Sequence, residues 1–404
     1  MLAPIYNCDG NERFGEATVN RPGQDGPVRG MGIRHNAMDL DLNRDWGKLE
    51  TPEARAMIRF LNEWDPHVVV DGHTTDGSYH RYLITYACPE MPAADPRLIT
   101  FARDEMMAQI SRSLRGRTDI DTFFYGDFAG DHENPPRPHN SWVMFPATAR
   151  YSTGYVSLRG RIGILSESYS YSPFKDRILG TLEFCREILR YAAAHGAEIR
   201  AMTAAATRAG AGTDGLPGEI AIRSKAAPAP GKVMIKGYVE ETREGRAVST
   251  NQPAEYECEV LNRFDSALTV TRPAGYLFTS PAPKVVENLR LHGVRIDEVA
   301  RDMDVEAEVY TIDGIKPASR AWQGHTLVEV EATPTRKAVH AAKGAALVRT
   351  DQPLGNLVVY WLEPECEDGL TTWNFFDEWL KPGGEFPVVR IVGPLPGAAP
   401  STGH

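Results

Sequence analysis

The stretch from Val68 to Gly77, Val-Val-Val-Asp-Gly-His-Thr-Thr-Asp-Gly, constrains the fold of this chain more than any other. Three consecutive valines after Asp65-Pro66 predict a short strand that is buried on both faces. The polar and glycine-rich residues that follow end this strand abruptly. Because ligands of open α/β sheets gather at the carboxyl ends of strands, His73 is a candidate functional residue. A purely structural histidine is the alternative at this position.

The neighbouring segments predict a layered α/β domain. A second strand is expected at Arg161–Tyr169, with Glu167 near its end. A helix is predicted at Thr51–Trp64, because Thr51 suits the N-cap, a proline follows it, and apolar residues repeat at helical spacing. Further helices are expected at Pro96–Leu114 and Phe174–Ala194. Alternating helices and buried strands are typical of a sheet covered by helices.

The composition argues against several classes of partner. The 404 residues carry a formal net charge of −10, which disfavours nucleic acid or an anionic membrane as a partner. Five cysteines are scattered without a Cys-x-x-Cys pair, so neither a disulfide scaffold nor a thiolate metal site is predicted. No apolar run approaches the ~20 residues of a membrane span. No signal peptide is recognised, and the sequence indicates no compartment.

The second half of the chain differs in composition. Residues 205–232 are rich in Ala, Gly and Pro and predict a linker between a domain at 1–204 and a domain at 233–404. The second domain is expected to be mainly β, with one helix at Pro283–Leu291. Its last strand is predicted at Leu357–Leu362, an unbroken apolar run. The strands expected before it are Lys232–Tyr238, Tyr256–Leu261, Leu268–Arg272, Glu306–Ile312 and Leu327–Glu331.

A histidine and a glutamate at two strand ends suit a zinc site with a general base. Catalytic zinc typically has three protein ligands and keeps a fourth position for water. The metal acidifies this water, and a nearby carboxylate accepts its proton. Upstream, Asn43 and Arg44 offer an amide and a planar guanidinium that fit a substrate carboxylate. The alternative is a surface ion pair between Arg44 and Asp41 or Asp45.

Four motifs resemble, in the same order, those of the zinc carboxypeptidases of the carboxypeptidase A type. Asn7-Cys-Asp-Gly10 resembles the family's Asn-Pro-Asp-Gly turn, and Asp41-Leu-Asn-Arg-Asp-Trp46 resembles its Asp-Leu-Asn-Arg-Asn-Trp/Phe. Asp71-Gly-His73 resembles its Asp-Leu-His, and Leu165-Ser-Glu167 resembles the strand that carries its catalytic glutamate. The resemblance spans about residues 7–170, and it implies a mixed sheet flanked by helices.

The resemblance also implies roles for individual residues. His73 would be a zinc ligand, Glu167 the general base, and Arg21 the residue that polarises the scissile carbonyl. Asn43 and Arg44 would bind the terminal carboxylate of the substrate. Two tyrosines, Tyr151 and Tyr155, precede the glutamate, and either could match the family's lid tyrosine or belong to the core.

The chain departs from the family at the first two zinc ligands. The family carries a His-x-x-Glu pair upstream of the Asn-Pro-Asp-Gly turn, and this sequence has only six residues before Asn7. The first residues read as the tail of a strand, so an N-terminally truncated domain is expected. His195-Gly-Ala-Glu198 has the His-x-x-Glu spacing but follows the other motifs instead of preceding them. A His and a Glu at this spacing are typical of a solvated helix face. His132-Glu133 and His139 are the remaining candidates for replacement ligands.

The sequence therefore predicts a zinc-dependent hydrolase that removes C-terminal residues from peptides, with weak zinc binding in this chain because two ligands are missing. A deacylase of N-acyl amino acids is the related alternative. A non-catalytic protein that binds carboxylates or peptides is the alternative from another class.

Overall fold

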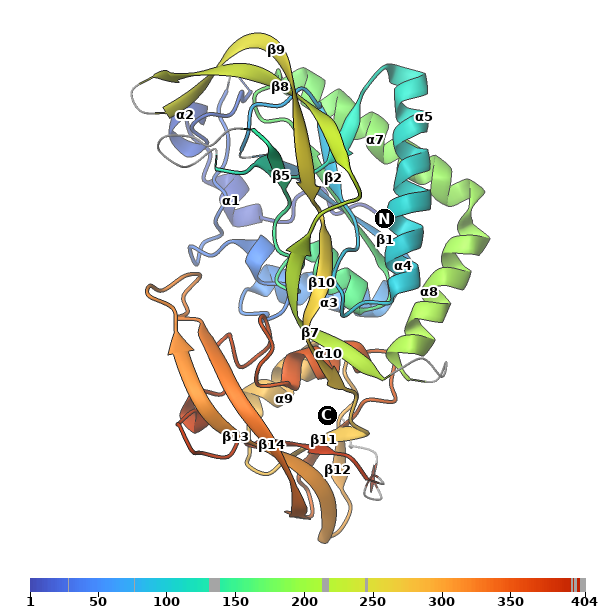
Figure 1. The fold of residues 1–404 in the computed structure, drawn as a ribbon, viewed down its shortest axis with the longest axis vertical. Coiled ribbons are helices and arrows are strands. Elements are labelled where there is room, and N and C mark those ends of the chain that lie inside the picture. Colours follow the sequence, from blue (N-terminus) through green and yellow to red (C-terminus); the bar gives the residue numbers. More distant parts are fainter. Residues whose placement is uncertain are drawn as a thin grey trace.

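The computed structural model shows a mixed α/β protein with four sheets in its described residues (Figure 1). Those residues are 1–27, 29–75, 77–130, 139–212, 218–243, 246–393, 395 and 398–399.

The first sheet contains both strands that were singled out from the sequence. Its order is β1 (Val68–Thr74), β6 (Ile162–Ser168), β2 (Ile84–Ala87) and β3 (Thr122–Phe124). β1 runs parallel to β6, β6 antiparallel to β2, and β2 parallel to β3. The sheet is therefore mixed, and the two candidate strands are direct neighbours.

The predicted helices of the first half are confirmed. α3 (Pro52–Trp64) begins after Thr51, whose side chain accepts a hydrogen bond from the amide of Ala54, and ends at Asp65 with a left-handed φ of 42°. α7 (Phe174–Ala194) has the predicted bounds. The helix expected from residue 96 is continuous in three parts: α4 (Pro96–Thr100), the π-helix η2 (Phe101–Met107) and α5 (Ala108–Thr118).

Helices cover both faces of the first sheet. One face packs against α4, η2, α5 and α7 through apolar side chains such as Ile164, Phe184 and Ile188. The other face packs against α3 and α6 (Ser152–Leu158) through residues that include Val69 and Ile58. Figure 1 shows α5, α7 and α8 (Gly196–Gly210) along one flank of the molecule.

The predicted linker at 205–232 is wrong, because it contains the end of α8 and the strand β7 (Glu219–Ala227). Alanine has the highest helix propensity, and the alanine-rich residues up to Gly210 continue α8. β7 pairs with β10 (Arg263–Thr271) in a two-stranded sheet.

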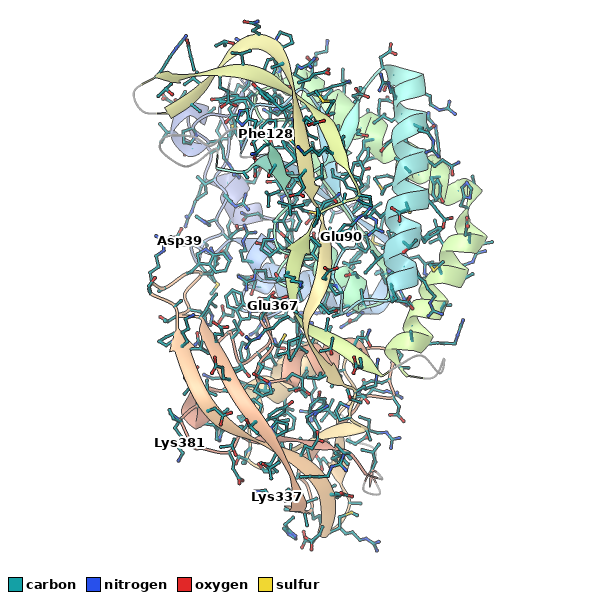
Figure 2. The ribbon with its side chains drawn as sticks, in the orientation of Figure 1. Asp39, Glu90, Phe128, Lys337, Glu367 and Lys381 are labelled. Atoms are coloured by element: carbon teal, nitrogen blue, oxygen red, sulfur yellow. The ribbon has the colours of Figure 1, made fainter. Side chains whose placement is uncertain are left out.

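The strands after residue 232 do not form a separate unit. β8 (Lys232–Arg243) and β9 (Arg246–Leu261) share one sheet with β4 (Asp127–Phe128) and β5 (Ser141–Val143), and β5 runs parallel to β9. Figure 2 shows Phe128 beside the β8–β9 hairpin, where it packs in an apolar cluster with residues of these strands. The predicted boundary at residue 233 therefore does not coincide with a break between sheets.

The last sheet has seven strands. Their order is β14 (Val328–Ala341), β13 (Met303–Pro317), β16 (Val388–Ile391), β11 (Gly275–Phe278), β15 (Ala346–Arg349), β12 (Asp297–Val299) and β17 (Ala398–Ala399). The predicted helix is confirmed as α9 (Pro283–Leu291). The strand predicted at 357–362 is wrong, because these residues belong to the fully buried helix α10 (Gly355–Leu362). A short apolar run without periodicity does not distinguish a buried strand from a buried helix.

The remaining elements are short. They are α1 (Cys8–Glu12), α2 (Ala17–Asn20), η1 (Leu42–Arg44) and η3 (Asp377–Trp379). None of the helices in the described ranges has the length and apolar character that crossing a membrane would require.

The valines of β1 are less buried than predicted. β1 is the outermost strand of its sheet, so only one side of it is paired with another strand. Val68 and Val69 are half-buried, and Val70 is 38% exposed. An exposed apolar edge strand is a template for pairing with another chain.

Replacing Val70 on this edge should change the self-association of the protein. We expect Val70→Lys to reduce aggregation, because a charged side chain on an edge strand opposes strand-to-strand pairing. Light scattering during storage would measure the effect. The control is Val19→Lys, since Val19 is 72% exposed but lies in a helix. An equal effect of both variants would show that added charge, and not the strand edge, is responsible.

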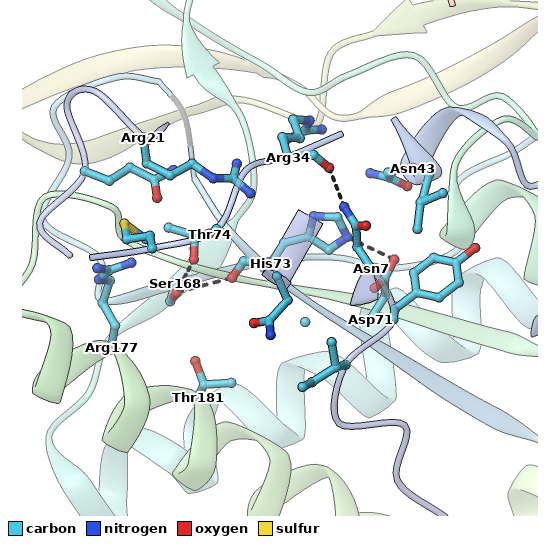
Figure 3. A pocket seen from close by; sticks show the side chains of 18 of the residues that line it. Asn7, Arg21, Arg34, Asn43, Asp71, His73, Thr74, Ser168, Arg177 and Thr181 are labelled. Carbon is cyan, nitrogen blue, oxygen red and sulfur yellow. Dashed lines mark hydrogen bonds and ion pairs between the residues drawn. The ribbon is translucent and has the colours of Figure 1, made fainter. Parts of the chain in front are cut away.

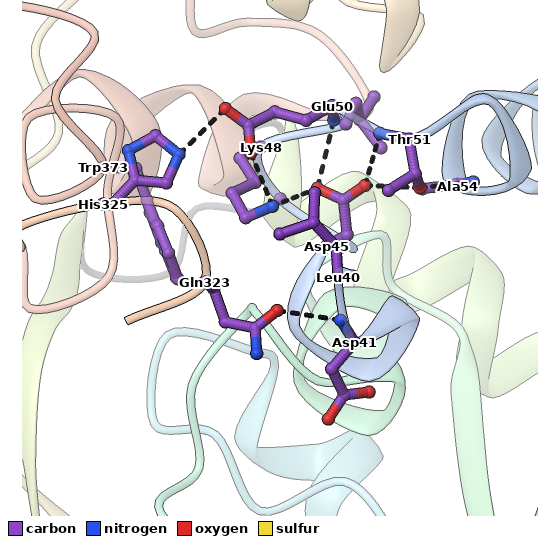
Figure 4. A network of polar contacts seen from close by, with 12 residues as sticks. Leu40, Asp41, Asp45, Lys48, Glu50, Thr51, Ala54, Gln323, His325 and Trp373 are labelled. Carbon is purple, nitrogen blue, oxygen red and sulfur yellow. Dashed lines mark hydrogen bonds and ion pairs between the residues drawn. The ribbon is translucent and has the colours of Figure 1, made fainter. Parts of the chain in front are cut away.

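A buried ion network holds the segment between η1 and α3 (Figure 4). The side chains of Asp45 and Lys48 are fully buried and 2.9 Å apart. The carboxylate of Asp45 also accepts hydrogen bonds from the amides of Glu50 and Thr51 and from the hydroxyl of Thr51. The carboxylate of Glu50 lies 2.8 Å from the Nε2 atom of His325. His325 belongs to the loop between β13 and β14.

Removing the central carboxylate should destabilise the fold strongly. We expect Asp45→Ala to lower the free energy of unfolding by ~3–5 kcal/mol, because the buried Lys48 would keep only Glu50, at 2.7 Å, and three hydrogen-bond donors of Glu50 and Thr51 would lose their acceptor. Chemical denaturation measures this change. Asp265→Ala, at an exposed position of β10, is the control and should cost less than about 0.5 kcal/mol. A loss of similar size in both variants would contradict the role of the network.

Candidate functional site

A pocket of about 1090 Å³ lies beside β1, between the N-terminal residues and α7 (Figure 3). Residues 4–7, residues 71–74 of β1 and apolar residues of α7, Ile178 and Leu182, line it. The pocket therefore opens along the carboxyl-terminal half of β1, where the sequence placed His73.

His73 and Glu167 occupy neighbouring positions at the ends of two parallel strands. In the β1–β6 register, His73 is directly opposite Glu167. Side chains at matching positions of a sheet point to the same face. The negative charge of Glu167, which is 6% exposed, is one of the effects that raise the pKa of His73. The histidine and the glutamate therefore face one site.

Asp71 is the direct partner of His73, two residues earlier on the same strand. Its carboxylate lies 3.0 Å from the Nε2 atom of His73. Burial alone would lower the pKa of His73, but the attraction of Asp71, the hydrogen bond to it and the charge of Glu167 together raise the pKa to about 9. Burial opposes ionisation of Asp71, and the attraction and hydrogen bond of His73 nevertheless hold the pKa of Asp71 below its usual range. The pair is therefore an imidazolium and a carboxylate at neutral pH.

Of the other predicted residues, Arg21 and Asn43 line the pocket as His73 does, whereas Glu167 is not among its lining residues. Burial and the nearby charge of Arg34 lower the pKa of Arg21, and no hydrogen bond or ion pair of its side chain is found with any described residue. The Oδ1 atom of Asn43 is buried and likewise has no partner among the residues described. The donors of Arg21 are therefore available to a ligand, and of the Asn43 amide only the Nδ2 group could donate to one.

Arg44 and Tyr151 contact each other but do not line the pocket. The guanidinium of Arg44 lies 4.7 Å from the ring centre of Tyr151 and 5.8 Å from that of Trp322. It donates to the carbonyl of Asn43 at 2.8 Å and lies 3.8 Å from Asp41. The alternative ion pair with Asp41 is therefore present, and Arg44 stands next to the pocket residue Asn43.

Tyr155 belongs to the core, which is one of the two roles that the sequence left open for it. Its side chain is fully buried in the core, and its hydroxyl lies 2.8 Å from the Nδ1 atom of His292. Arg159 donates a second hydrogen bond to this hydroxyl. Tyr155 lies in α6, whose residues are all buried, so its role is structural.

The candidate replacement ligands do not reach the pocket where they are described. His139 stacks on Phe128 at 4.2 Å and pairs with Glu240, so it belongs to the sheet of β8 and β9. His195 pairs with Glu198 on the surface of α8, as expected for a solvated face. The third candidate, His132-Glu133, lies outside the described residues.

The described residues do not fit a zinc site. His73 is the imidazole of the pocket, and its Nε2 atom faces Asp71. Across the ranges that the structure describes, no group of three or more His, Cys, Asp or Glu side chains is placed to hold a metal ion.

Sequence reasoning missed two arginines, Arg34 and Arg177, that line the pocket. Arg34 donates to Asp41 at 2.8 Å, so Asp41 lies between Arg34 and Arg44. Arg177, in the first turn of α7, is 4% exposed. Both reach the pocket from segments without a recognisable motif. The sequence offers no signal that would have singled them out.

Comparison of the chain with protein-family models, with curated protein sequences and with solved structures gives no match.

The raised pKa of His73 should make stability depend on pH. A histidine whose pKa rises from 6.5 to about 9 on folding stabilises the folded state fully below pH 6.5, and this contribution is lost as the pH rises through about 9. The total change is on the order of 3 kcal/mol. Denaturation across this range measures it, and His73→Gln should remove the dependence. An imidazole of His73 that titrates near 6.5 in NMR spectra would contradict this assignment.

Proposed function

We propose that this chain is a hydrolase of the carboxypeptidase type, and that its pocket binds the free C-terminal carboxylate of a peptide. The observation that carries the proposal is the register of β1 and β6, which sets His73 against Glu167 beside a pocket lined by Asn43 and Arg21. A mixed sheet with helices on both faces is the architecture that the resemblance implied. Three of the four motifs supply residues that line the pocket, Asn7, Asn43 and His73, and Glu167 supports the proposal by its position opposite His73, although it does not line the pocket.

The terminal carboxylate would bind near Asn43. The side chain of Asn43 lines the pocket, and Arg34 and Arg44 both contact Asp41 nearby. Asp41 makes its closer contact, at 2.8 Å, with Arg34. A substrate carboxylate here would receive charge-assisted hydrogen bonds, which are stronger than neutral ones.

Glu167 and Arg21 would serve the chemical step. In hydrolysis of a peptide bond, Glu167 would accept a proton from the attacking water and return it to the leaving amine. Arg21, with its unused donors, would stabilise the negative charge that forms on the carbonyl oxygen. The ion pair of His73 and Asp71 would keep the neighbouring groups of the site in position and fix the local charge. No step is assigned to zinc, since the described residues do not hold it.

A non-catalytic carboxylate-binding protein is the second candidate. One observation in its favour is the ion pair between His73 and Asp71, which engages the Nε2 atom of His73. Another is that no metal-ligand group is found within the described ranges. Zinc content of the purified protein and hydrolysis of acylated dipeptides separate the two candidates. Turnover supports the hydrolase, and tight binding without turnover supports the binding protein; stoichiometric zinc would show that residues outside the described ranges complete a metal site. A deacylase would act on N-acyl amino acids in the same assay.

Both candidates require a free carboxylate on the ligand. We expect an acetylated dipeptide to bind at least about tenfold tighter than its C-terminal amide, because the amide loses the charge that the arginines bind. Asn43→Ala and Arg44→Lys should each weaken binding of the free acid and leave the amide unchanged. Arg208→Lys, in α8, is the matched control for the arginine. Calorimetry measures these affinities, and equal affinity for acid and amide would refute the proposed function.

A further inference from the structure

Two arginines in the pocket have no carboxylate partner. Of the arginines that line it, Arg34 is paired with Asp41, and the other pocket acid, Asp71, is paired with His73. Arg21 and Arg177 form no ion pair with any described carboxylate. The chain has a net charge of −10, so this local excess of positive charge runs against the protein as a whole. Such a pocket attracts anions.

Arg177 is held rigidly at the pocket wall. Its Nε atom donates to the carbonyl of Ser172 at 3.2 Å, and its Nη2 atom donates to the carbonyl of Asp25. Its guanidinium also lies 5.4 Å from the ring centre of Phe174. These contacts are with uncharged groups, although the charge of the nearby Asp25 carboxylate also acts on Arg177 and opposes the lowering of its pKa by burial. A guanidinium has five N–H donors. The remaining donors can serve a ligand without breaking any of these contacts.

The position of Arg177 is distinct from the carboxylate position near Asn43. Figure 3 shows His73 between the two, with Asn43 on one side and Arg21 and Arg177 on the other. Thr74 and Ser168, whose hydroxyls are 3.2 Å apart, lie on the side of the arginines. Each directly follows a residue of the acid–base pair, so each points to the opposite face of the sheet, toward α7.

This geometry gives a direction to the substrate. With the terminal carboxylate at Asn43, the bond to be cleaved lies near His73 and Glu167. The part of the substrate on the acyl side of that bond then extends toward Arg21 and Arg177. We propose that Arg177 binds a second carboxylate on the acyl side, assisted by those donors of Arg21 that do not serve the carbonyl oxygen, so that the preferred ligands are peptides with Asp or Glu directly before the C-terminal residue. This inference rests on the proposed function.

Two peptides that differ only in this charge provide the test, and calorimetry gives the affinities. Acetyl-Glu-Ala and acetyl-Gln-Ala have the same shape, and we expect the first to bind at least about tenfold tighter. Arg177→Gln should abolish the difference by weakening acetyl-Glu-Ala alone. Arg186→Gln is the control, because Arg186 lies on the solvent side of the same helix in a surface ion pair with Glu183.

Because Arg177 is buried, its variant must be shown to fold by its melting temperature. If it does not fold, Arg21→Gln replaces it, since the half-buried Arg21 supports no other described side chain. This variant should also reduce the preference for acetyl-Glu-Ala. Equal binding of both peptides by the unmodified protein, or a preference that survives both substitutions, would overturn the second carboxylate position.

The failure of this inference is distinguishable from the failure of the proposed function. If both acetylated dipeptides bind equally and their C-terminal amides do not bind, the carboxylate position near Asn43 stands and the acyl-side position falls. If neither dipeptide binds, or the amides bind as well as the acids, the proposed function itself falls.

Discussion

The candidate site depends on the parallel pairing of β1 and β6. These strands are separated by more than 80 residues in the chain, and only their register brings His73 opposite Glu167. A shift of one residue would turn one of the two side chains to the other face of the sheet. All residues of β6 are buried, and their packing on both faces of the sheet fixes this register. The position of the acid–base pair is therefore a consequence of core packing.

The C-terminal half supports the site although it carries no recognisable catalytic motif. The side chain of Gln323 accepts a hydrogen bond from the amide of Asp41 at 2.8 Å, and His325 contacts Glu50. Trp322, from the same loop, lies beside Arg44. The segment that presents Asn43 is thus held from within by the buried pair of Asp45 and Lys48 and from outside by the loop between β13 and β14.

Local signals in the sequence predicted most of the helices and strands. Thr51 and the proline after it defined the start of α3, and periodic apolar residues defined α7. The same reasoning failed for Leu357–Leu362, because its apolar run has no period that separates a strand from a helix buried on all sides. It overestimated the burial of Val70, because an edge position depends on strand order and not on local composition.

The site was predictable where residues belong to motifs and not elsewhere. His73, Asn43 and Arg21 were named from the sequence and line the pocket. Tyr155 was named from its spacing before Glu167, but helix α6 turns it into the core. Arg177 and Arg34 were missed because long-range packing brings them to the pocket.

The charges of the pocket have a consequence for its chemistry. Each acid that lines it is matched by a cation, Asp71 by His73 and Asp41 by Arg34. Arg21 and Arg177 have no such match among the described carboxylates. Desolvation lowers the pKa of both without neutralising either. Unpaired, partly desolvated guanidinium groups cost stability in the free protein. An anionic ligand recovers that cost on binding, so the arrangement is understandable as a site that is complete only with its ligand.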